Sequence, residues 1–284
     1  MPEYTEITNI TTYNQRMTQS AMDKAFFVDK IDAKIIVDYG CADGFLFSLI
    51  GHFFPEDTIF IGYDNDPNMV KLARERFKDN LENFYFFSNW SDLKNCISKI
   101  NYNIHRDGIN EVKTAVVLSS VLHELYEYLT VKDIDAFWKD IFDFDYVVIR
   151  DMIPSEKVDR PTDINDVRKV YRKFYGTKEL TDFQNKWGSI ENNKSLLHFL
   201  LKYKYVVPNW EREVKENYFP FYKEHLFCLF PDNFEIIYHE HYCLPYLKGQ
   251  IMNDFGIEVK DSTHLKIIFK NKVCSQNLTT EKHD

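Results

Sequence analysis

The chain has 284 residues, of which 44% are hydrophobic and 28% charged, so it can bury the core of a folded domain and differs in composition from disordered chains. Its net charge of −9 argues against general adhesion to nucleic acid or to an anionic membrane surface, but allows a local basic site. The five cysteines form no C-x-x-C pair, no apolar run approaches the ~20 residues of a membrane span, and the N-terminus lacks a signal-peptide pattern, so we expect a soluble cytoplasmic protein.

A helix and then a buried strand are the first predicted elements. Apolar residues recur at helical spacing between residues 13 and 30. The run Ile-Ile-Val at residues 35–37 suits a strand that is covered on both faces. A turn follows at residues 38–44, in which two glycines permit a sharp bend, and the apolar spacing then becomes helical. The N–H groups and the positive end of that helix favour a small polar or anionic ligand over the turn.

The glycine spacing of this turn argues against two common phosphate sites. A dinucleotide fingerprint starting at Gly40 would need glycine where Ala42 and Phe45 stand. A Walker loop would need Lys and then Ser or Thr directly after Gly44, where Phe and Leu stand instead. The remaining pattern, Asp38-x-Gly40-x-x-x-Gly44, resembles motif I of the class I S-adenosylmethionine-dependent methyltransferases.

A second predicted strand, residues 58–63, ends in a carboxylate at Asp64. This acid stands 64 − 44 = 20 residues after Gly44, and doubly wound nucleoside-binding folds place an acid about 20 residues on to accept both ribose hydroxyls. The continuation Asn65-Asp66-Pro67 and a helix matches the family's habit of a turn, a proline and a helix. Because the two motifs stand at the expected spacing from each other, together they predict an S-adenosylmethionine site in a doubly wound α/β domain.

The resemblance also implies which residues hold the cofactor. The first turn holds the methionine part, Asp38 orients it, and the leading helix closes over it, so that Arg16 or Lys24 either meets the methionine carboxylate or lies on a solvated face. A third strand, residues 83–88, ends where many family members have an Asp at the adenine amino group. Asn89 stands there, and Trp90 either stacks on adenine or packs on its own helix. The candidate cofactor residues are Arg16, Lys24, Asp38, Gly40, Ala42, Gly44, Asp64, Asn65, Asn89, Trp90 and Ser119.

Catalytic candidates lie where the next two predicted strands end. Residues 114–125 are a strand that runs into a helix, and residues 145–154 contain a strand that ends in the charged pair Arg150 and Asp151. Ligands of open parallel sheets sit beyond the carboxyl ends of the strands, so side chains there line the same crevice as the first turn. His123 or Glu124 is the first candidate for a general base and Asp151 the second, although His123 also fits a buried structural histidine. Arg150 either contacts the substrate or bridges to a neighbouring charge.

The remaining sequence divides into a mainly helical insertion and the final strands. Residues 155–232 have helical patterns and are too long for a simple crossover, so we expect a substrate cap. Two late strands, within residues 233–272, suit the antiparallel pair that ends class I methyltransferase sheets and bring the total to seven. Residues 1–154 are then the leading helix and cofactor-binding core, and residues 273–284 a flexible tail.

The methyl acceptor is left open between two classes. Arg168 and Arg172 lie four residues apart and share one basic face of a helix in the insertion, where they are candidates for substrate binding. Such a face suits a small anionic or aromatic metabolite under the cap, or RNA lying across it, and the acidity of the chain favours the small O or N acceptor. A non-catalytic S-adenosylmethionine sensor or scaffold is the rival class. We expect no metal, because the alternating His239, His241 and Cys243 have no fourth ligand at a short spacing.

Overall fold

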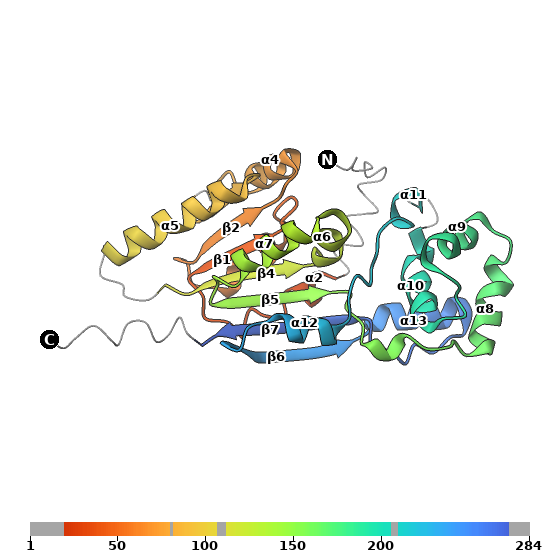
Figure 1. Ribbon diagram of the computed structural model, residues 1–284. Helices are drawn as coiled ribbons and strands as arrows, with labels where there is room; N and C mark the ends of the chain where they lie inside the picture. Colours follow the sequence, from red (N-terminus) through yellow and green to blue (C-terminus); the bar gives the residue numbers. More distant parts are fainter. Residues whose placement is uncertain (1–19, 80–81, 107–111, 206–209, 273–284) are drawn as a thin grey trace.

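The computed structural model describes residues 20–79, 82–106, 112–205 and 210–272. Its centre is a seven-stranded sheet in the order β3-β2-β1-β4-β5-β7-β6, drawn in Figure 1. Neighbours from β3 to β5 pair in parallel, whereas β7 runs antiparallel to both β5 and β6. The prediction of a doubly wound seven-stranded sheet with an antiparallel last strand is confirmed. The strands are β1 Ile35–Tyr39, β2 Ile59–Tyr63, β3 Phe84–Phe87, β4 Thr114–Ser119, β5 Tyr146–Asp151, β6 Phe234–Tyr242 and β7 His264–Asn271.

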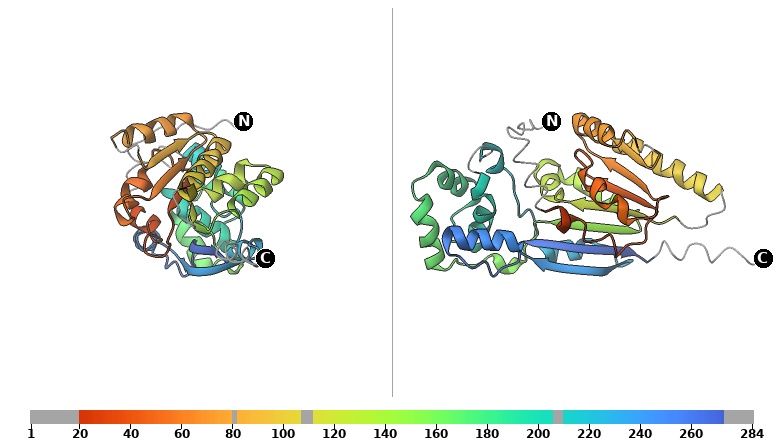
Figure 2. Two further views of the ribbon diagram at one scale, coloured as in Figure 1. Left: turned by 90° about the vertical axis from the view of Figure 1, so that its left-hand side faces the viewer. Right: turned by 180° about the vertical axis from the view of Figure 1, so that it is seen from behind.

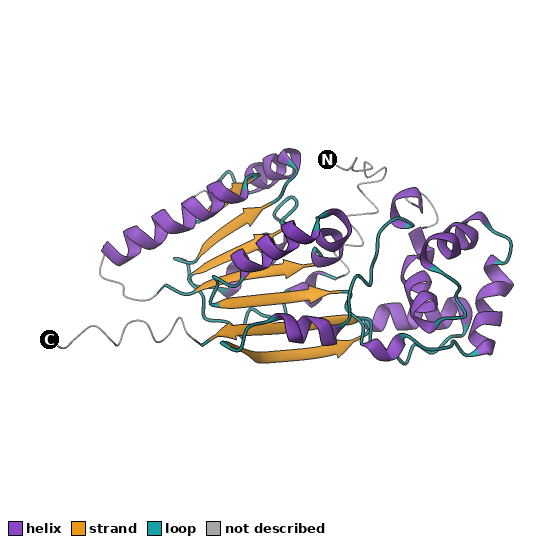
Figure 3. Ribbon diagram, viewed as in Figure 1, coloured by secondary structure: helices purple, strands orange, loops and turns teal. Residues whose placement is uncertain are grey.

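Helices cover both faces of the sheet, because alternate residues of each central strand point to opposite sides. Val37 packs on one side with Leu93, Trp138 and Leu226, whereas Ile36 packs on the other with Phe47. Figure 3 shows the resulting layers. The helices of the first layer are α5 Trp90–Arg106, α6 Leu122–Tyr128, α7 Val131–Ile141 and α12 Lys223–Leu229. Those of the second are α2 Ala21–Lys24, α3 Phe45–Ile50, which η1 Gly51–Phe53 extends, and α4 Pro67–Arg76.

The leading helix differs from its prediction over residues 13–30. Within the described residues it is the short α2, and residues 25–30 form turns. A helix of four residues is too short to be stable alone. Its position therefore depends on contacts with the rest of the molecule.

A second hydrophobic core lies in a helical cap beyond the carboxyl ends of β4 and β5 (Figures 1 and 2). This cap differs in two places from the predicted insertion of residues 155–232. Helix α13, between β6 and β7, adds Ile251 and Phe255 to the cap core, whereas Leu226 of α12 packs on the sheet. The local pattern predicts these helices but not the layer that each one joins. The cap elements are η2 Glu156–Val158, α8 Ile164–Phe174, α9 Lys178–Trp187, α10 Asn193–Lys202, η3 Tyr203–Tyr205, α11 Trp210–Glu213 and α13 Pro245–Phe255.

Candidate active site

The first turn of the site joins β1 to α3 through left-handed backbone. Gly40 and Gly44 have φ of 80° and 75°, values that glycine adopts without a steric penalty. Ala42 between them has φ of 46°, which is strained for a residue with a side chain. Its N–H donates a hydrogen bond of 2.9 Å to Oδ2 of Asp64, so the carboxylate at the end of β2 holds the strained turn in place.

Asp64 has both of its oxygens directed to this corner of the sheet. Its Oδ1 accepts the N–H of Asp66 at 2.9 Å, and partial burial raises the pKa of the carboxyl group. Because each carboxylate oxygen has further lone pairs, both can accept hydroxyl groups of a ribose as well. Asn65 follows on the loop and is exposed.

A buried acid and a buried base lie next to the turn. Asp38 is only 4% exposed, and this burial raises its pKa to about 7, although Lys24 acts in the opposite direction. Lys24 of α2 is 6% exposed, and burial and then Arg150 lower its pKa to about 8, against the effect of Asp38, Asp151 and Asp23. An ammonium group inside the protein thus faces carboxylates from β1 and β5. The other predicted cation of the leading helix, Arg16, lies outside the described residues.

The two cofactor candidates at the end of β3, Asn89 and Trp90, both contact neighbouring parts of the protein. The side-chain oxygen of Asn89 accepts the N–H groups two and three residues further on, at 2.9 and 3.2 Å, and so caps α5. Trp90 packs with ring centroids 5.0 Å from Tyr39 and 5.2 Å from Tyr63. Its Nε1 donates to Asp140 of α7 at 2.7 Å. These contacts of Trp90 are with β1, β2 and α7 rather than with its own helix.

An ion pair between His123 and Asp151 lies where β4 and β5 end. Nδ1 of the imidazole lies 2.8 Å from Oδ1 of Asp151, whose Oδ2 accepts the N–H of Leu122 at 2.8 Å. Asp151 is 0% exposed, and although burial raises the pKa of its carboxyl group, the net effect of His123 and of hydrogen bonding is to lower it. Burial lowers the pKa of His123, but the charge and hydrogen bond of Asp151, with smaller effects of Glu124 and Glu216, raise it overall to about 9.

The end of β4 also carries strain and an unpaired hydroxyl. Ser120 has φ of 58°, and its Oγ accepts a hydrogen bond of 2.8 Å from Nη1 of Arg150. The Oγ of Ser119 is buried and has no hydrogen-bond partner among the residues that the structure describes. A buried hydroxyl without a partner costs free energy, so a polar ligand group at this edge would stabilise it.

The cap adds further residues to the site, of which Tyr218 and Glu216 were not predicted from the sequence. The ring of Tyr218 lies edge-on to the imidazole of His123, with centroids 5.8 Å apart. Arg212 donates from Nε to Glu216 at 2.9 Å, and its Nη2 lies 3.7 Å from Oε1 of Glu124. Burial raises the pKa of Glu124, against the charge of His123. The surroundings of the imidazole are therefore aromatic and rich in carboxylates.

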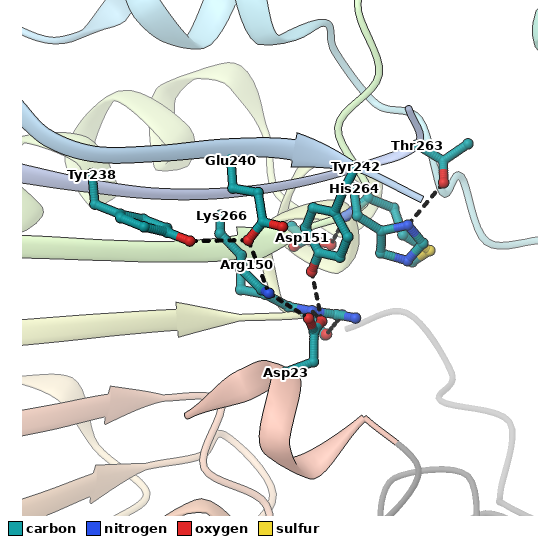
Figure 4. Close-up of polar contacts among 11 residues, drawn as sticks. Asp23, Arg150, Asp151, Tyr238, Glu240, Tyr242, Thr263, His264 and Lys266 are labelled. Atoms are coloured by element: carbon teal, nitrogen blue, oxygen red, sulfur yellow. Dashed lines mark hydrogen bonds and ion pairs between the residues drawn. The ribbon is translucent and has the colours of Figure 1, made fainter. Parts of the chain in front are cut away.

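The predicted substrate arginines do not meet at the site. Arg150 is buried, and its Nε donates to Asp23 at 2.8 Å, so its charge is neutralised inside the protein (Figure 4). Arg168 and Arg172 are exposed on α8, which lies at the outer end of the cap in Figure 1, away from the sheet. Charge periodicity predicts which face of a helix is solvated, but not where the helix lies in the fold.

Among the described residues, no group of three His, Cys, Asp or Glu side chains is arranged to hold a metal ion. The Nε2 of His241 instead lies 3.1 Å from the carbonyl oxygen of Ile153. No helix in the described part of the chain combines the length and the apolar character needed to span a bilayer.

The residues at this edge fit the groups of S-adenosylmethionine. Asp64 offers acceptors for ribose hydroxyls, Lys24 a cation for a carboxylate, and Asp38 an anion for an ammonium group. The unpaired hydroxyl of Ser119 can both donate and accept. This donor and acceptor set, rather than a single contact, is the basis of the fit.

No protein-family model and no curated protein matches the sequence. Among solved structures, the chain is similar to the mitomycin 7-O-methyltransferase MmcR, at 12% identity and a TM-score of 0.47, over 91% of this chain and 56% of that one. It is similar to the pyocyanin biosynthetic protein PhzM, at 13% identity and a TM-score of 0.47, over 91% and 57% of the two chains. It is also similar to the plantazolicin methyltransferase BamL, in complex with S-adenosylhomocysteine, at 11% identity and a TM-score of 0.43, over 92% of this chain and 88% of that one.

The chain thus spans little more than half the length of MmcR and PhzM. The fold rests on the sheet itself, in which β7 runs antiparallel between β5 and β6 and Asp64 closes the motif I turn. Sheet order and motif together give this chain the fold of the class I S-adenosylmethionine-dependent methyltransferase family.

Proposed function

We propose that the protein is an S-adenosylmethionine-dependent methyltransferase that acts on an oxygen or nitrogen atom of a small molecule. One observation carries the proposal. The Asp64-bound glycine turn and the buried His123–Asp151 pair converge on the same edge of the sheet, at the carboxyl ends of neighbouring parallel strands. An adenosyl site and a titratable group in this arrangement are what transfer to a hydroxyl or amine requires.

The chain's own residues would bind and orient the cofactor. Asp64 would accept the ribose hydroxyls, while Asp38, Lys24 and Ser119 would meet the methionine part. The exposed Asn65 stands beside the ribose acceptor. Both lone pairs of the Asn89 oxygen already cap α5, so the NH₂ group of this side chain is the part that would meet the adenine. When bound, S-adenosylmethionine supplies an already activated methyl group, so few protein groups need take part in chemistry.

His123 is the proposed base. Because its Nδ1 is held by Asp151, Nε2 is the nitrogen that would take a proton from the acceptor. With a pKa of about 9, the imidazole is largely protonated at neutral pH, so its basic form grows as the pH rises toward 9. Asp151 would orient the ring and stabilise its positive charge rather than act as the base. Glu124 would add a smaller stabilisation of the same charge.

The surroundings of His123 support a neutral aromatic acceptor over an anionic one. Asp151, Glu124 and Glu216 all raise the pKa of the imidazole, and like charges would repel an anion that approached it. The ring of Tyr218 supplies an aromatic wall at the same place. The basic face of α8 does not offset these carboxylates, because α8 lies at the outer end of the cap.

Calorimetry with S-adenosylhomocysteine tests the cofactor assignment. We expect the native protein to bind it and Asp64→Asn to bind at least ~10-fold more weakly, because one charged acceptor is lost. Circular dichroism would check that the variant is folded, since Asp64 also holds the turn. Equal binding by the two proteins, or no binding by the native one, would refute the assignment.

A cell extract with labelled S-adenosylmethionine then tests transfer. We expect the native protein to label a small molecule and His123→Gln to label it far more slowly under saturating cofactor. Label in RNA would favour the nucleic-acid alternative, in which the exposed Arg168 and Arg172 would contact the acceptor. Cofactor binding without any labelled product would favour a sensor.

A further inference from the structure

Asp23 of α2 is bonded to three neighbouring strands at once, as Figure 4 shows. Its Oδ2 accepts from Nε of Arg150 on β5 at 2.8 Å and from the hydroxyl of Tyr242 on β6 at 2.6 Å. Its Oδ1 lies 2.7 Å from Nζ of Lys266 on β7. The side chain of Asp23 is 12% exposed, so these charged bonds are poorly screened by solvent.

The donors to Asp23 are themselves fixed. Arg150 also donates to Ser120 at 2.8 Å, and Lys266 lies 3.2 Å from Glu240 on β6. Arg150 and Lys266 are paired across the sheet, as are Glu240 and Lys266. The sheet therefore presents a preformed set of donors, and α2 cannot shift without breaking charged hydrogen bonds to several strands.

Lys24 is the next residue of the same short helix. It is 6% exposed, and the carboxylates of Asp38 and Asp151 are among the charges that act on it. Since α2 has only four residues, its own backbone hydrogen bonds cannot hold it in place. The bonds of Asp23 thus fix the backbone from which the buried ammonium group of Lys24 projects.

We propose that Asp23 is a positioning residue, whose bonds to Arg150, Tyr242 and Lys266 hold Lys24 where it binds the carboxylate of the methionine part of the cofactor. This inference rests on the proposed function, to which it adds the way Lys24 is held in position. The strands β5, β6 and β7 would thereby set the affinity for the amino-acid end of the cofactor. They would leave the affinity for its nucleoside end unchanged, because Asp64 lies on the other side of β1.

Two ligands distinguish binding of the amino-acid end of the cofactor from binding of its nucleoside end. S-adenosylhomocysteine has the nucleoside and the amino-acid part, whereas 5′-methylthioadenosine has the nucleoside and thioether without the amino acid. We expect Lys24→Met and Asp23→Asn to weaken S-adenosylhomocysteine by roughly 10-fold, and Tyr242→Phe by roughly 3-fold, in calorimetry. The affinity for 5′-methylthioadenosine should change less than about 2-fold in all three, because none of them touches the nucleoside end.

The matched control is Asp29→Asn, which removes an exposed carboxylate of the same N-terminal segment that pairs only with its neighbour Lys30 among the described residues. It should leave both affinities unchanged. Native-like binding of S-adenosylhomocysteine by Asp23→Asn and Tyr242→Phe would overturn the inference while the proposed function stands. Equal weakening of both probes would overturn it too, since that is the mark of a general structural role. Failure of the native protein to bind S-adenosylhomocysteine would instead reject the proposed function, and the inference with it.

Discussion

The charge of the buried imidazole at neutral pH is the property of the site that can be measured without knowing the acceptor. The pKa of His123 is raised from 6.5 to about 9, and this difference is equivalent to ~3 kcal/mol in favour of the charged form. Because the folded-state pKa is the higher one, this stabilisation is fully present below pH 6.5. It is lost as the pH rises from 6.5 through about 9.

Nuclear magnetic resonance of the protein labelled at histidine gives the pKa directly, with His123→Asn to assign the signal. We expect a value near 9 in the native protein and a value below 6.5 in Asp151→Asn, because burial of the ring remains while its main counter-charge is gone. Glu216→Gln should lower the pKa only slightly, since Glu216 is the smallest of the causes that raise it.

Urea unfolding measures the contribution of this raised pKa to the free energy of unfolding. The stability difference between the native protein and His123→Asn should shrink by ~3 kcal/mol between pH 6.5 and 9.5, and taking the difference removes the contribution of other groups that titrate there. Turnover, once an acceptor is known, should rise with pH through the same range. A native pKa at or below 6.5, or a value near 9 that survives Asp151→Asn, would refute the assignment of the ion pair.

Two further predictions concern packing and the basic helix. Gly62→Ala on β2 should destabilise the protein by ~1–3 kcal/mol in urea unfolding, because the new Cβ would lie 2.6 Å from the ring of Phe86. Gly249→Ala, at an exposed position of α13 where the new Cβ would meet no described atom within 4 Å, should stabilise it by ~0.5–1 kcal/mol. Arg168→Glu combined with Arg172→Glu should leave the affinity for S-adenosylhomocysteine unchanged, and RNA binding that is steeply salt-dependent in the native protein and absent in this variant would contradict a small-molecule acceptor.

The sheet and the first turn were predictable because their signals are local. Strands β1, β2 and β4 are apolar runs that end in a polar residue or a glycine turn, and the structure has them within a residue or two of the predicted bounds. Gly40 and Gly44 adopt the left-handed backbone that the turn predicts. The 20-residue spacing from Gly44 identified Asp64 in the sequence. In the structure this carboxylate accepts a hydrogen bond from the N–H of Ala42, because β1 and β2 are neighbours in the sheet.

Most contacts within the candidate site were not predictable, because they join residues far apart in the chain. Asp23 meets Arg150 across 127 residues and Tyr242 across 219. Tyr218 reaches His123 from a segment with no motif of its own. In each case the local sequence gives the chemistry of the side chain, but only the packing of the cap and the last strands decides what it touches.

The cap has a consequence for how this architecture can be altered. It is assembled from two separate stretches of chain, one that follows β5 and one, containing α13, that lies between β6 and β7. A transplant of residues 155–232 alone into a related core would therefore leave behind part of the cap's interior, including Ile251 and Phe255, and carry along α12, whose Leu226 belongs under the sheet. Exchange of acceptor specificity between such proteins would require two coordinated replacements, and a single-cassette chimaera would have an incomplete interior on both sides of the junction.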